Sequence, residues 1–480
     1  MENKGFVWKL LNHFAQADEK LTAFSIYDGT QQKDITYHQF LDDILNTAGY
    51  FAENQISGKH IAIVGASSYQ WIVVFFAVMA SGNVVVPMNQ LLPMDILQWQ
   101  CKKSDIDMIC CDDNEMMEGI GGIPVICFDR LYSDITLSLH DLCFPCEEKT
   151  ILMMFTSGTT GRSKAVSITA RNLSSSVVNL LYAMKQEGLN ALPGMERLLI
   201  IMPLFHVAAI RAILVAFLQL STLCFGRGAK YVFMDMPILN PTHVPMVPAM
   251  IESICKILKR TPNQDRHKII GNGLKIIGVG GAAPQKDCVM YLVEQGMIIH
   301  TIYGMTETAG DGTWGILTER RSNMLGYPCG NMQCKIQNGE ILLKNPSVMK
   351  GYYKDREETE KVIEDGWIHT GDMGYCDEDG YYYITGRKKN VIILSNGENV
   401  NPEEIEATLG DCGAIEECLV YSDGKGICAD VYAPDRNPAV DFIRAYNENM
   451  PMYRQIYKVN YTEEPLEKTG SGKIKRKENK

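Results

Sequence analysis

The first regular pattern of hydrophobic residues lies at positions 61–87. Four apolar residues, 61–64, are followed by a Gly-Ala pair, then by a helix-length apolar stretch at 69–80 and a second short apolar run at 84–87. This order predicts a strand, a helix and a second strand. Because such units form parallel sheets with right-handed crossovers, we expect ligands to bind at the carboxyl ends of the strands.

A similar order recurs in the second half of the chain. Two apolar runs, 275–279 and 296–303, predict buried strands. The first ends in Gly280-Gly281 and the second in Gly304-Met305-Thr306-Glu307, so each strand leads into a loop. Both loops are therefore candidates for a ligand site at the carboxyl edge of a sheet.

The pattern changes after about residue 320. Short alternating runs such as 339–343 and 380–384, bounded by Gly, Asp or Asn, indicate antiparallel strands or a small barrel. A charged cluster at 386–390 then precedes Asn401-Pro402 and two carboxylates, which is typical of a helix start. We therefore expect a large N-terminal domain of residues 1–386 and a smaller C-terminal domain of residues 387–480.

Composition excludes several classes of protein. The chain has 480 residues, of which 46% are hydrophobic, and a formal net charge of −11, which is typical of a globular protein of several domains and argues against nucleic-acid binding. The longest apolar run, 71–80, is shorter than the roughly 20 residues that span a bilayer, so no transmembrane segment is expected. Fifteen irregularly spaced cysteines, and an N-terminus without an apolar signal core, favour the cytoplasm.

The strongest candidate for chemistry is the segment 154–164. An apolar run opens there into a loop of glycines and hydroxyl residues that closes on Lys164. Glycines let backbone N–H groups approach an anion, hydroxyls donate hydrogen bonds, and the lysine adds positive charge. A polyphosphate site is therefore predicted, although a polar surface turn has a similar composition. The P-loop spacing is not met, because Ser163 stands where its second glycine would be.

Eight segments in order along the chain resemble the motifs of the adenylate-forming (AMP-binding) superfamily. This superfamily includes acyl-CoA synthetases, adenylation domains of peptide synthetases and luciferases. The resemblance covers nearly the whole chain and departs from the usual pattern at Ser163 and Ala165, on either side of Lys164. The segments are 156–164, 203–206, 280–284, 303–307, 370–372, 386–389, 396–402 and 465–473.

The resemblance implies an α/β fold, with a large N-terminal domain of doubly wound sheets and a small β-barrel-like subdomain. A smaller, mobile α+β domain is expected to follow it. The implied enzyme is an AMP-forming acid–thiol ligase that uses ATP, Mg²⁺ and coenzyme A. A substrate carboxylate attacks the α-phosphate of ATP to give acyl-AMP and pyrophosphate, and the acyl group is then transferred to the thiol.

The resemblance also assigns roles to individual residues. Lys473 would contact the carboxylate and the α-phosphate, whereas an arbitrary lysine so near the chain end would be expected in solvent. Glu307 would hold Mg²⁺, and Thr306 beside it would donate a hydrogen bond to phosphate. His206, in a mainly apolar run, would border the acyl pocket, although a lone histidine there is usually a core residue. These four residues are the catalytic candidates.

Further assignments concern the nucleotide and the hinge. Tyr303 would stack on adenine, and the pair Asp372 and Arg387 would bind the ribose hydroxyls, although an ordinary surface ion pair is the alternative. Lys389 would be the hinge about which the C-terminal domain rotates. The residues expected to bind the nucleotide are Thr156, Ser157, Gly158, Thr159, Thr160, Gly161, Lys164, Gly281, Ala282, Ala283, Pro284, Tyr303, Gly304, Thr306, Asp372 and Arg387.

Three functions stay open at this point. The first is a carboxylate:CoA ligase for a fatty or aryl acid, of which succinylbenzoate is one example. The second is an enzyme that loads a phosphopantetheinyl acyl carrier protein, and the third is a catalytically silent nucleotide-binding regulator. A zinc site at Cys143 and Cys146 is not expected, because no second CxxC or clustered histidine completes a ligand set.

Overall fold

The fold is described from a computed structural model. It describes residues 5–113, 117, 120–133, 135, 137–156, 163–189, 192–281, 284–394, 399–468 and 474–477. The chain divides into two compact units, the first of residues 1–334 with 343–368 and the second of residues 335–342 with 369–480. The predicted boundary at 386–387 was defined by the domain that is expected to move, not by compactness, and it stays a prediction.

The first unit contains a seven-stranded sheet with the order β18-β8-β7-β4-β3-β5-β6. Strands β3, β4 and β5 pair in parallel, whereas β7 and β8 are antiparallel. The predicted strand–helix–strand unit is thus confirmed, with α3 (Tyr69–Ala80) between β3 and β4. The strands are β3 (His60–Val64), β4 (Val84–Met88), β5 (Met108–Cys111), β6 (Val125–Cys127), β7 (Thr150–Phe155), β8 (Ala165–Thr169) and β18 (Gly351–Tyr352).

A nine-stranded sheet has the order β15-β14-β13-β12-β11-β9-β10-β1-β2. The predicted strands near 275–279 and 296–303 are β12 and β13, which pair in parallel. The carboxyl ends of these two strands therefore lie together. The strands are β1 (Thr22–Tyr27), β2 (Gln32–Thr36), β9 (Arg197–Leu199), β10 (Thr222–Phe225), β11 (His243–Met246), β12 (Ile276–Gly280), β13 (Ile298–Gly304), β14 (Gly312–Ile316) and β15 (Tyr327–Pro328).

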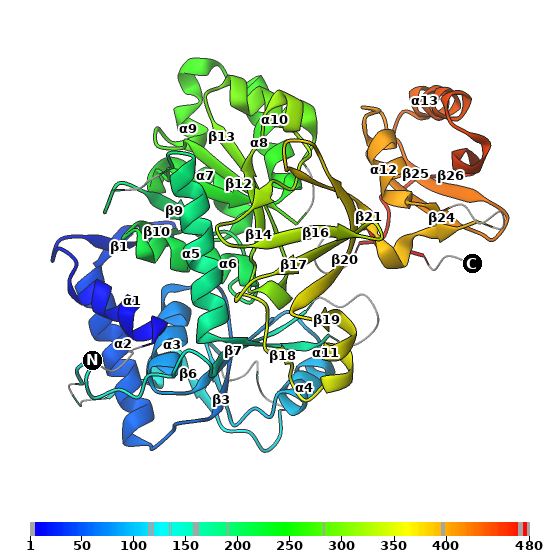
Figure 1. The fold of residues 1–480 in the computed structure, drawn as a ribbon. Helices are drawn as coiled ribbons and strands as arrows, with labels where there is room; N and C mark the ends of the chain where they lie inside the picture. The colour runs from blue at the N-terminus through cyan, green and yellow to red at the C-terminus, as the bar shows by residue number, and fades with distance from the viewer. Residues whose placement is uncertain are drawn as a thin grey trace. The chain divides into compact units, whose positions relative to one another are not determined.

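Helices fill the space between these two sheets. Helix α5 packs on β8 of one sheet and α6 packs on β10 of the other (Figure 1), and a single cluster of buried side chains draws on both sheets. Among the described residues, no helix is long and apolar enough to cross a membrane. The helices of this unit are α1 (Phe6–Ala15), α2 (Tyr37–Glu53), α3, α4 (Met94–Lys103), α5 (Ala170–Gln186), α6 (Val207–Leu218), α7 (Val232–Leu239), α8 (Pro248–Arg260), α9 (His267–Ile270), α10 (Lys286–Glu294) and α11 (Arg356–Val362).

The predicted antiparallel region after residue 320 is a five-stranded sheet. Its order is β16-β17-β20-β19, and β21 pairs with β20. The unit boundaries at 342–343 and 368–369 fall inside β17 and β20. The strands are β16 (Gln333–Gln337), β17 (Glu340–Lys344), β19 (Ile363–Glu364), β20 (Trp367–Cys376) and β21 (Tyr382–Arg387).

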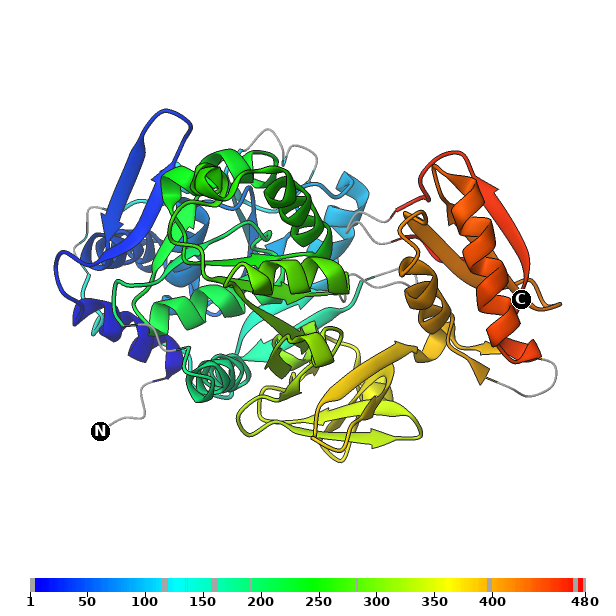
Figure 2. The same cartoon turned by 90° about the horizontal axis from the view of Figure 1, so that it is seen from above.

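The C-terminal residues form a small α+β layer with its own core. Helix α12 (Pro402–Gly410) packs on β24, and α13 (Arg436–Asn449) packs on β26. Figure 2 shows these helices in orange and red against their strands. As predicted, α12 begins with proline, and Glu403 and Glu404 lie in its first turn. The strands are β22 (Ile392–Ile393), β23 (Asn399–Val400), β24 (Glu417–Ser422), β25 (Ile427–Tyr432) and β26 (Ile456–Thr462).

Two buried histidines lie inside the nine-stranded sheet. The Nε2 atoms of His243 and His300 are 3.2 Å apart, and the indole N–H of Trp314 donates to Nδ1 of His300 at 3.1 Å. Because the indole only donates, His300 carries its proton on Nε2 and donates to a neutral His243. Burial lowers the pKa of His243 to about 4, and burial together with His243 lowers the pKa of His300 well below its usual value.

We expect the stability of the first unit to fall on acidification because of this pair. The folded-state pKa values lie below the unfolded value of about 6.5, so the unfolded chain binds protons first. The stabilisation is complete above about pH 6.5 and is lost toward pH 4, by up to about 1.4 kcal/mol per pH unit for each histidine. Urea unfolding between pH 4.5 and 7.5 measures this dependence of the free energy of unfolding on pH. His300→Gln should reduce the slope of the unfolding free energy against pH, whereas the substitution of an exposed histidine, His140→Gln, should not. Equal slopes in wild type and His300→Gln would contradict the assignment of this pH dependence to the buried pair.

Candidate active site

The predicted phosphate loop connects two antiparallel strands, β7 and β8. Its base is closed by two hydrogen bonds, in which Thr156 N–H donates to the carbonyl of Lys164 at 3.0 Å and Lys164 N–H donates to Oγ1 of Thr156 at 3.2 Å. The structure thus brings together the first and last residues of the loop. Several predicted site residues lie outside the described residues, namely Ser157, Gly158, Thr159, Thr160, Gly161, Ala282, Ala283 and Lys473.

The side chain of Lys164 is held by two neighbours. Its Nζ atom forms an ion pair with Oε2 of Glu358 at 2.5 Å, and it lies 4.7 Å from the ring centroid of Tyr352. The alanine that departs from the family pattern, Ala165, is a buried residue of β8. It is the first residue of the strand, directly after Lys164.

Glu307 lies in the turn that follows β13 and is only 8% exposed. The hydroxyl of Tyr352 donates to Oε1 of Glu307 at 2.8 Å, and the backbone N–H of Met349 donates to the carbonyl of Glu307 at 2.7 Å. Burial and the Glu307 carboxylate raise the pKa of Tyr352. Tyr352 therefore connects Glu307 to Lys164, with its hydroxyl on the first and its ring face toward the second.

The donor set fits a magnesium ion that is shared with a nucleotide. Among the described residues, no group of three or more His, Cys, Asp or Glu side chains could enclose a metal by itself. Mg²⁺ is usually bound by one or two carboxylates together with substrate phosphates and water. Glu307, which is buried at the end of β13 and is connected to the loop lysine through Tyr352, would supply that carboxylate.

The predicted adenine site lies where β12 and β13 end. Gly280 pairs with Ile302, which places the segments around Gly281 and Tyr303 side by side. Tyr303 is half-buried, and Gly281 has φ +84°. At Gly304 a Cβ atom would lie 2.4 Å from the carbonyl oxygen of Gly310, so only glycine fits there. Half-buried Thr306 and the described Pro284 lie on the same two loops.

The two residues predicted to bind the ribose form an ion pair, and their role toward the ribose stays a prediction. Asp372 of β20 faces Arg387 of β21 in register, and Nε of Arg387 lies 2.7 Å from Oδ1 of Asp372. Asp372 is 4% exposed and Arg387 is 48% exposed, so the carboxylate is fixed within the sheet while the guanidinium reaches solvent. The backbone N–H of Asp372 also donates to Oγ1 of Thr370 at 3.0 Å.

One carboxylate that supports this pair was missed from the sequence. Glu340 of β17 is 4% exposed and accepts from Nζ of Lys388 at 2.8 Å, from the ring of His369 at 3.1 Å and from the N–H of Gly371 at 3.0 Å. Burial alone would raise its pKa, but these three donors lower the pKa of Glu340 below its usual value. The alternating pattern at 339–343 predicted the strand. The charged residue Glu340 at an inward position of that strand was the signal that could have indicated a supporting carboxylate.

The hinge candidate, Lys389, lies in a short turn of residues 388–390 and is exposed. Although the residue as a whole is exposed, neighbouring atoms partly desolvate its ammonium group, and this desolvation together with the positive charges of Arg387 and Arg476 lowers the pKa of Lys389. A solvated residue in a turn is compatible with a hinge.

On either side of the segment that carries Lys473, Lys468 and Ile474 pair as an isolated antiparallel bridge.

His206 does not lie in the core. It precedes the first residue of α6 and is exposed, with its ring centroid 4.5 Å from that of Phe205. The alternative that His206 is a core residue is therefore not met, and its expected place beside the acyl pocket stays a prediction.

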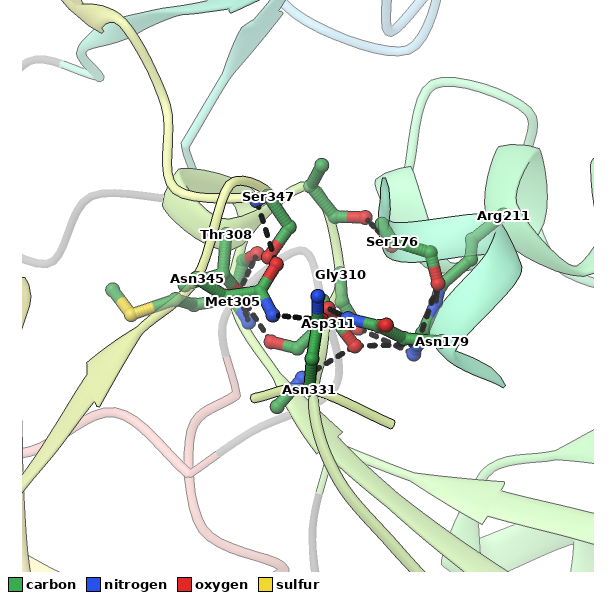
Figure 3. Close-up of polar contacts among 12 residues, drawn as sticks. Ser176, Asn179, Arg211, Met305, Thr308, Gly310, Asp311, Asn331, Asn345 and Ser347 are labelled. Carbon is green, nitrogen blue, oxygen red and sulfur yellow. Dashed lines mark hydrogen bonds and ion pairs between the residues drawn. The ribbon is translucent and has the colours of Figure 1, made fainter. Parts of the chain in front are cut away.

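A second set of residues that sequence reasoning missed lies just after Glu307 (Figure 3). Arg211 of α6 forms a 2.7 Å ion pair with Oδ1 of Asp311, and their side chains are 2% and 0% exposed. The side-chain amide of Asn179, on α5, donates to Oδ2 of the same carboxylate at 2.7 Å. Both oxygens of Asp311 are thus bonded inside the core.

The same network holds the backbone of this turn. Arg211 donates to the carbonyl of Gly310 at 2.8 Å, and the hydroxyl of Ser176 donates to the carbonyl of Ala309 at 2.8 Å. Ala309 has φ +53°, a left-handed conformation that costs about 1–2 kcal/mol for a residue other than glycine. Side chains from α5 and α6 therefore fix the turn that carries Thr306 and Glu307.

Comparison with known proteins identifies the family. The sequence profile of the AMP-binding enzymes matches residues 11–353. The chain belongs to the AMP-binding enzyme family. A 2-succinylbenzoate–CoA ligase from Oceanobacillus iheyensis is 32% identical to this AMP-binding enzyme over 393 residues, which cover 76% of this chain and 75% of the relative. A long-chain-fatty-acid–CoA ligase from Mycobacterium tuberculosis is 25% identical over 437 residues, which cover 77% of this chain and 72% of the relative.

The fold of this AMP-binding enzyme is also similar to solved structures. O-succinylbenzoate coenzyme A synthetase from Bacillus subtilis, in complex with ATP and magnesium ion, superimposes with a TM-score of 0.82 at 24% identity, covering 97% of this chain and 98% of that chain. The predicted superfamily and the α/β fold class are confirmed. The predicted enzyme class, an AMP-forming acid–thiol ligase, is confirmed as well.

Proposed function

We propose that this enzyme activates an aryl acid of the 2-succinylbenzoate type with ATP and Mg²⁺ and transfers it to coenzyme A. The observation that carries the proposal is the assembly of Lys164, Tyr352 and Glu307 beside the base of the phosphate loop. The ligases from Oceanobacillus and Bacillus support the choice of acid. The enzyme is an ATP-dependent ligase that forms acyl-AMP and then acyl-CoA.

In the first half-reaction a carboxylate oxygen bonds to the α-phosphorus, and the bond from phosphorus to the pyrophosphate oxygen breaks. Both reactants are anionic, so preorganised positive charge stabilises the transition state more than the ground state. Lys164 binds the β- and γ-phosphates, and Lys473 contacts the carboxylate and the α-phosphate. Glu307 would hold Mg²⁺ together with the phosphates, and the bound ion would supply positive charge that offsets part of theirs.

The remaining residues hold the nucleotide. Tyr303 lies against adenine, Asp372 accepts from the ribose hydroxyls with Arg387 beside it, and Thr306 donates to phosphate. In the second half-reaction the coenzyme A sulfur bonds to the acyl carbon and AMP leaves. Rotation about Lys389 removes Lys473 from the site between the two steps, so one site serves both.

The acid and the acceptor each have a second candidate. A fatty acid is favoured by the similarity to the mycobacterial long-chain ligase. His206, at the start of α6, borders the acyl pocket in either case. An acyl carrier protein in place of coenzyme A would require the same adenylation chemistry, so only the acceptor distinguishes the two functions.

We place the reaction in the cytoplasm, because an odd number of irregularly spaced cysteines favours a reducing compartment.

Acid-dependent release of pyrophosphate from ATP and Mg²⁺, measured with and without coenzyme A, tests the function. The panel contains 2-succinylbenzoate, simple aryl acids, fatty acids of short, medium and long chain, and amino acids. We expect the largest release with 2-succinylbenzoate and the matching acyl-CoA as product. Release without any acyl-CoA, together with loading of a holo carrier protein, would contradict the acceptor. No release with any acid would favour the silent regulator.

A further inference from the structure

Glu358 is an acidic residue at the predicted phosphate site that the mechanism above does not use. It lies in α11, and its Oε2 atom is 2.5 Å from Nζ of Lys164 although the two residues are 194 positions apart. Both side chains are 32% exposed, so solvent and ligands can reach the pair. The loop lysine is therefore already bonded to an anion of the protein itself.

The helix holds Glu358 in place and keeps it charged. Lys361, one turn later, lies 2.7 Å from Oε1 of Glu358, and the side chain of Asp355 caps the helix by accepting from the N–H of Glu358 at 3.3 Å. Lys164 and Lys361 lower the pKa of Glu358 to about 2. The carboxylate is thus ionised at any pH at which the enzyme works.

The position of Lys164 indicates that the Glu358 carboxylate takes the place of a phosphate oxygen of ATP. Its ammonium group lies over the ring of Tyr352, whose hydroxyl is bonded to the Mg²⁺ candidate Glu307. A polyphosphate shared between Glu307-bound Mg²⁺ and Lys164 would offer the lysine the same kind of acceptor, an anionic oxygen. Glu358 and the polyphosphate therefore require the same cation.

We propose that Glu358 competes with the polyphosphate of ATP for Lys164 and thereby sets the affinity of the enzyme for ATP. The proposal rests on the proposed function, because it takes Lys164 as a phosphate ligand. Removing the charge of Glu358 releases the lysine and also removes a negative charge next to the triphosphate. Both effects act in the same direction, toward tighter binding of ATP.

The test compares the KM for ATP of the full chain and of charge-neutralised variants in the pyrophosphate assay. We expect Glu358→Gln to lower the KM for ATP about two- to fivefold, the range of a partly exposed ion pair, with kcat and the KM for the acid unchanged. High salt should reduce the difference, because it screens exposed charges.

A matched control lies one residue away. Glu357 carries the same charge on the same helix and lies 2.8 Å from Lys361, but it is 83% exposed and points to solvent. Glu357→Gln should leave the KM for ATP nearly unchanged. In a Lys164→Met background, Glu358→Gln should give no more improvement than Glu357→Gln does, since the shared cation is then missing.

The outcomes separate the inference from the function on which it rests. Wild-type enzyme without acid-dependent pyrophosphate release would contradict the proposed function. If wild type is active and Lys164→Met raises the KM for ATP, the function and the lysine assignment stand. An unchanged or raised KM in Glu358→Gln would then overturn the competition, and so would an equal improvement with and without Lys164.

Discussion

Lys473→Ala is expected to abolish most adenylation while sparing thioester formation from supplied acyl-AMP. In the proposed mechanism Lys473 would supply positive charge to the carboxylate and the α-phosphate only in the first half-reaction, where charge concentrates on the phosphorus oxygens. Removing one such preorganised group typically costs about 10²- to 10³-fold in rate. Pyrophosphate release measures the first step, and coenzyme A consumption with synthetic acyl-AMP measures the second.

Two comparisons make this prediction specific. Lys475 lies two residues away, is 61% exposed and pairs with Glu467 at 2.8 Å, so Lys475→Ala should leave both half-reactions nearly unchanged. Gly397→Leu should show the reverse of Lys473→Ala, because the family resemblance implies that the loop around Gly397, in the segment 396–402, replaces Lys473 at the site during thioester formation. Equal loss of both half-reactions in each variant would contradict a rotation of the C-terminal domain.

The sequence predicted the frame of the fold because its signals are local. Apolar runs that end in glycine define the strands β3, β12 and β13, and Pro402 with two carboxylates defines the start of α12. The pairing of Asp372 with Arg387 was expected from the family resemblance, and these two residues face each other across β20 and β21. The loops that these patterns placed at strand ends carry the candidate site.

The residues that support the site could not be predicted in the same way. Lys164 and Glu358 are 194 positions apart, and Tyr352 and Glu307 are 45 apart, so no helical or strand period relates them. Their partners are set by how β8, β18 and α11 pack, which depends on the whole unit. Glu340 carried a weak signal, a charge at an inward strand position, whereas the exposure of His206 depends on where α6 begins.

The second large effect is expected from the buried network behind Glu307. Arg211→Met should reduce the free energy of unfolding by about 3–5 kcal/mol, because Asp311 would remain fully buried without its cation. The hydrogen bond to the carbonyl of Gly310 would be lost as well. Since this turn carries Thr306 and Glu307, the protein that still folds should show a raised KM for ATP. Equilibrium unfolding in urea and the pyrophosphate assay measure the two effects.

A double variant distinguishes the ion pair from simple loss of packing. Arg211→Met with Asp311→Asn leaves no buried charge, so it should recover part of the stability that Arg211→Met loses. Arg171→Met is the matched control. Arg171 lies on α5, next to the helix α6 that carries Arg211, but it pairs with Glu148 where both side chains are more than half exposed, at 56% and 66%. It should cost no more than about 1 kcal/mol. If the double variant is as unstable as Arg211→Met, the unpaired buried charge is not the cause of the instability, and the lost hydrogen bonds and packing of Arg211 would account for it.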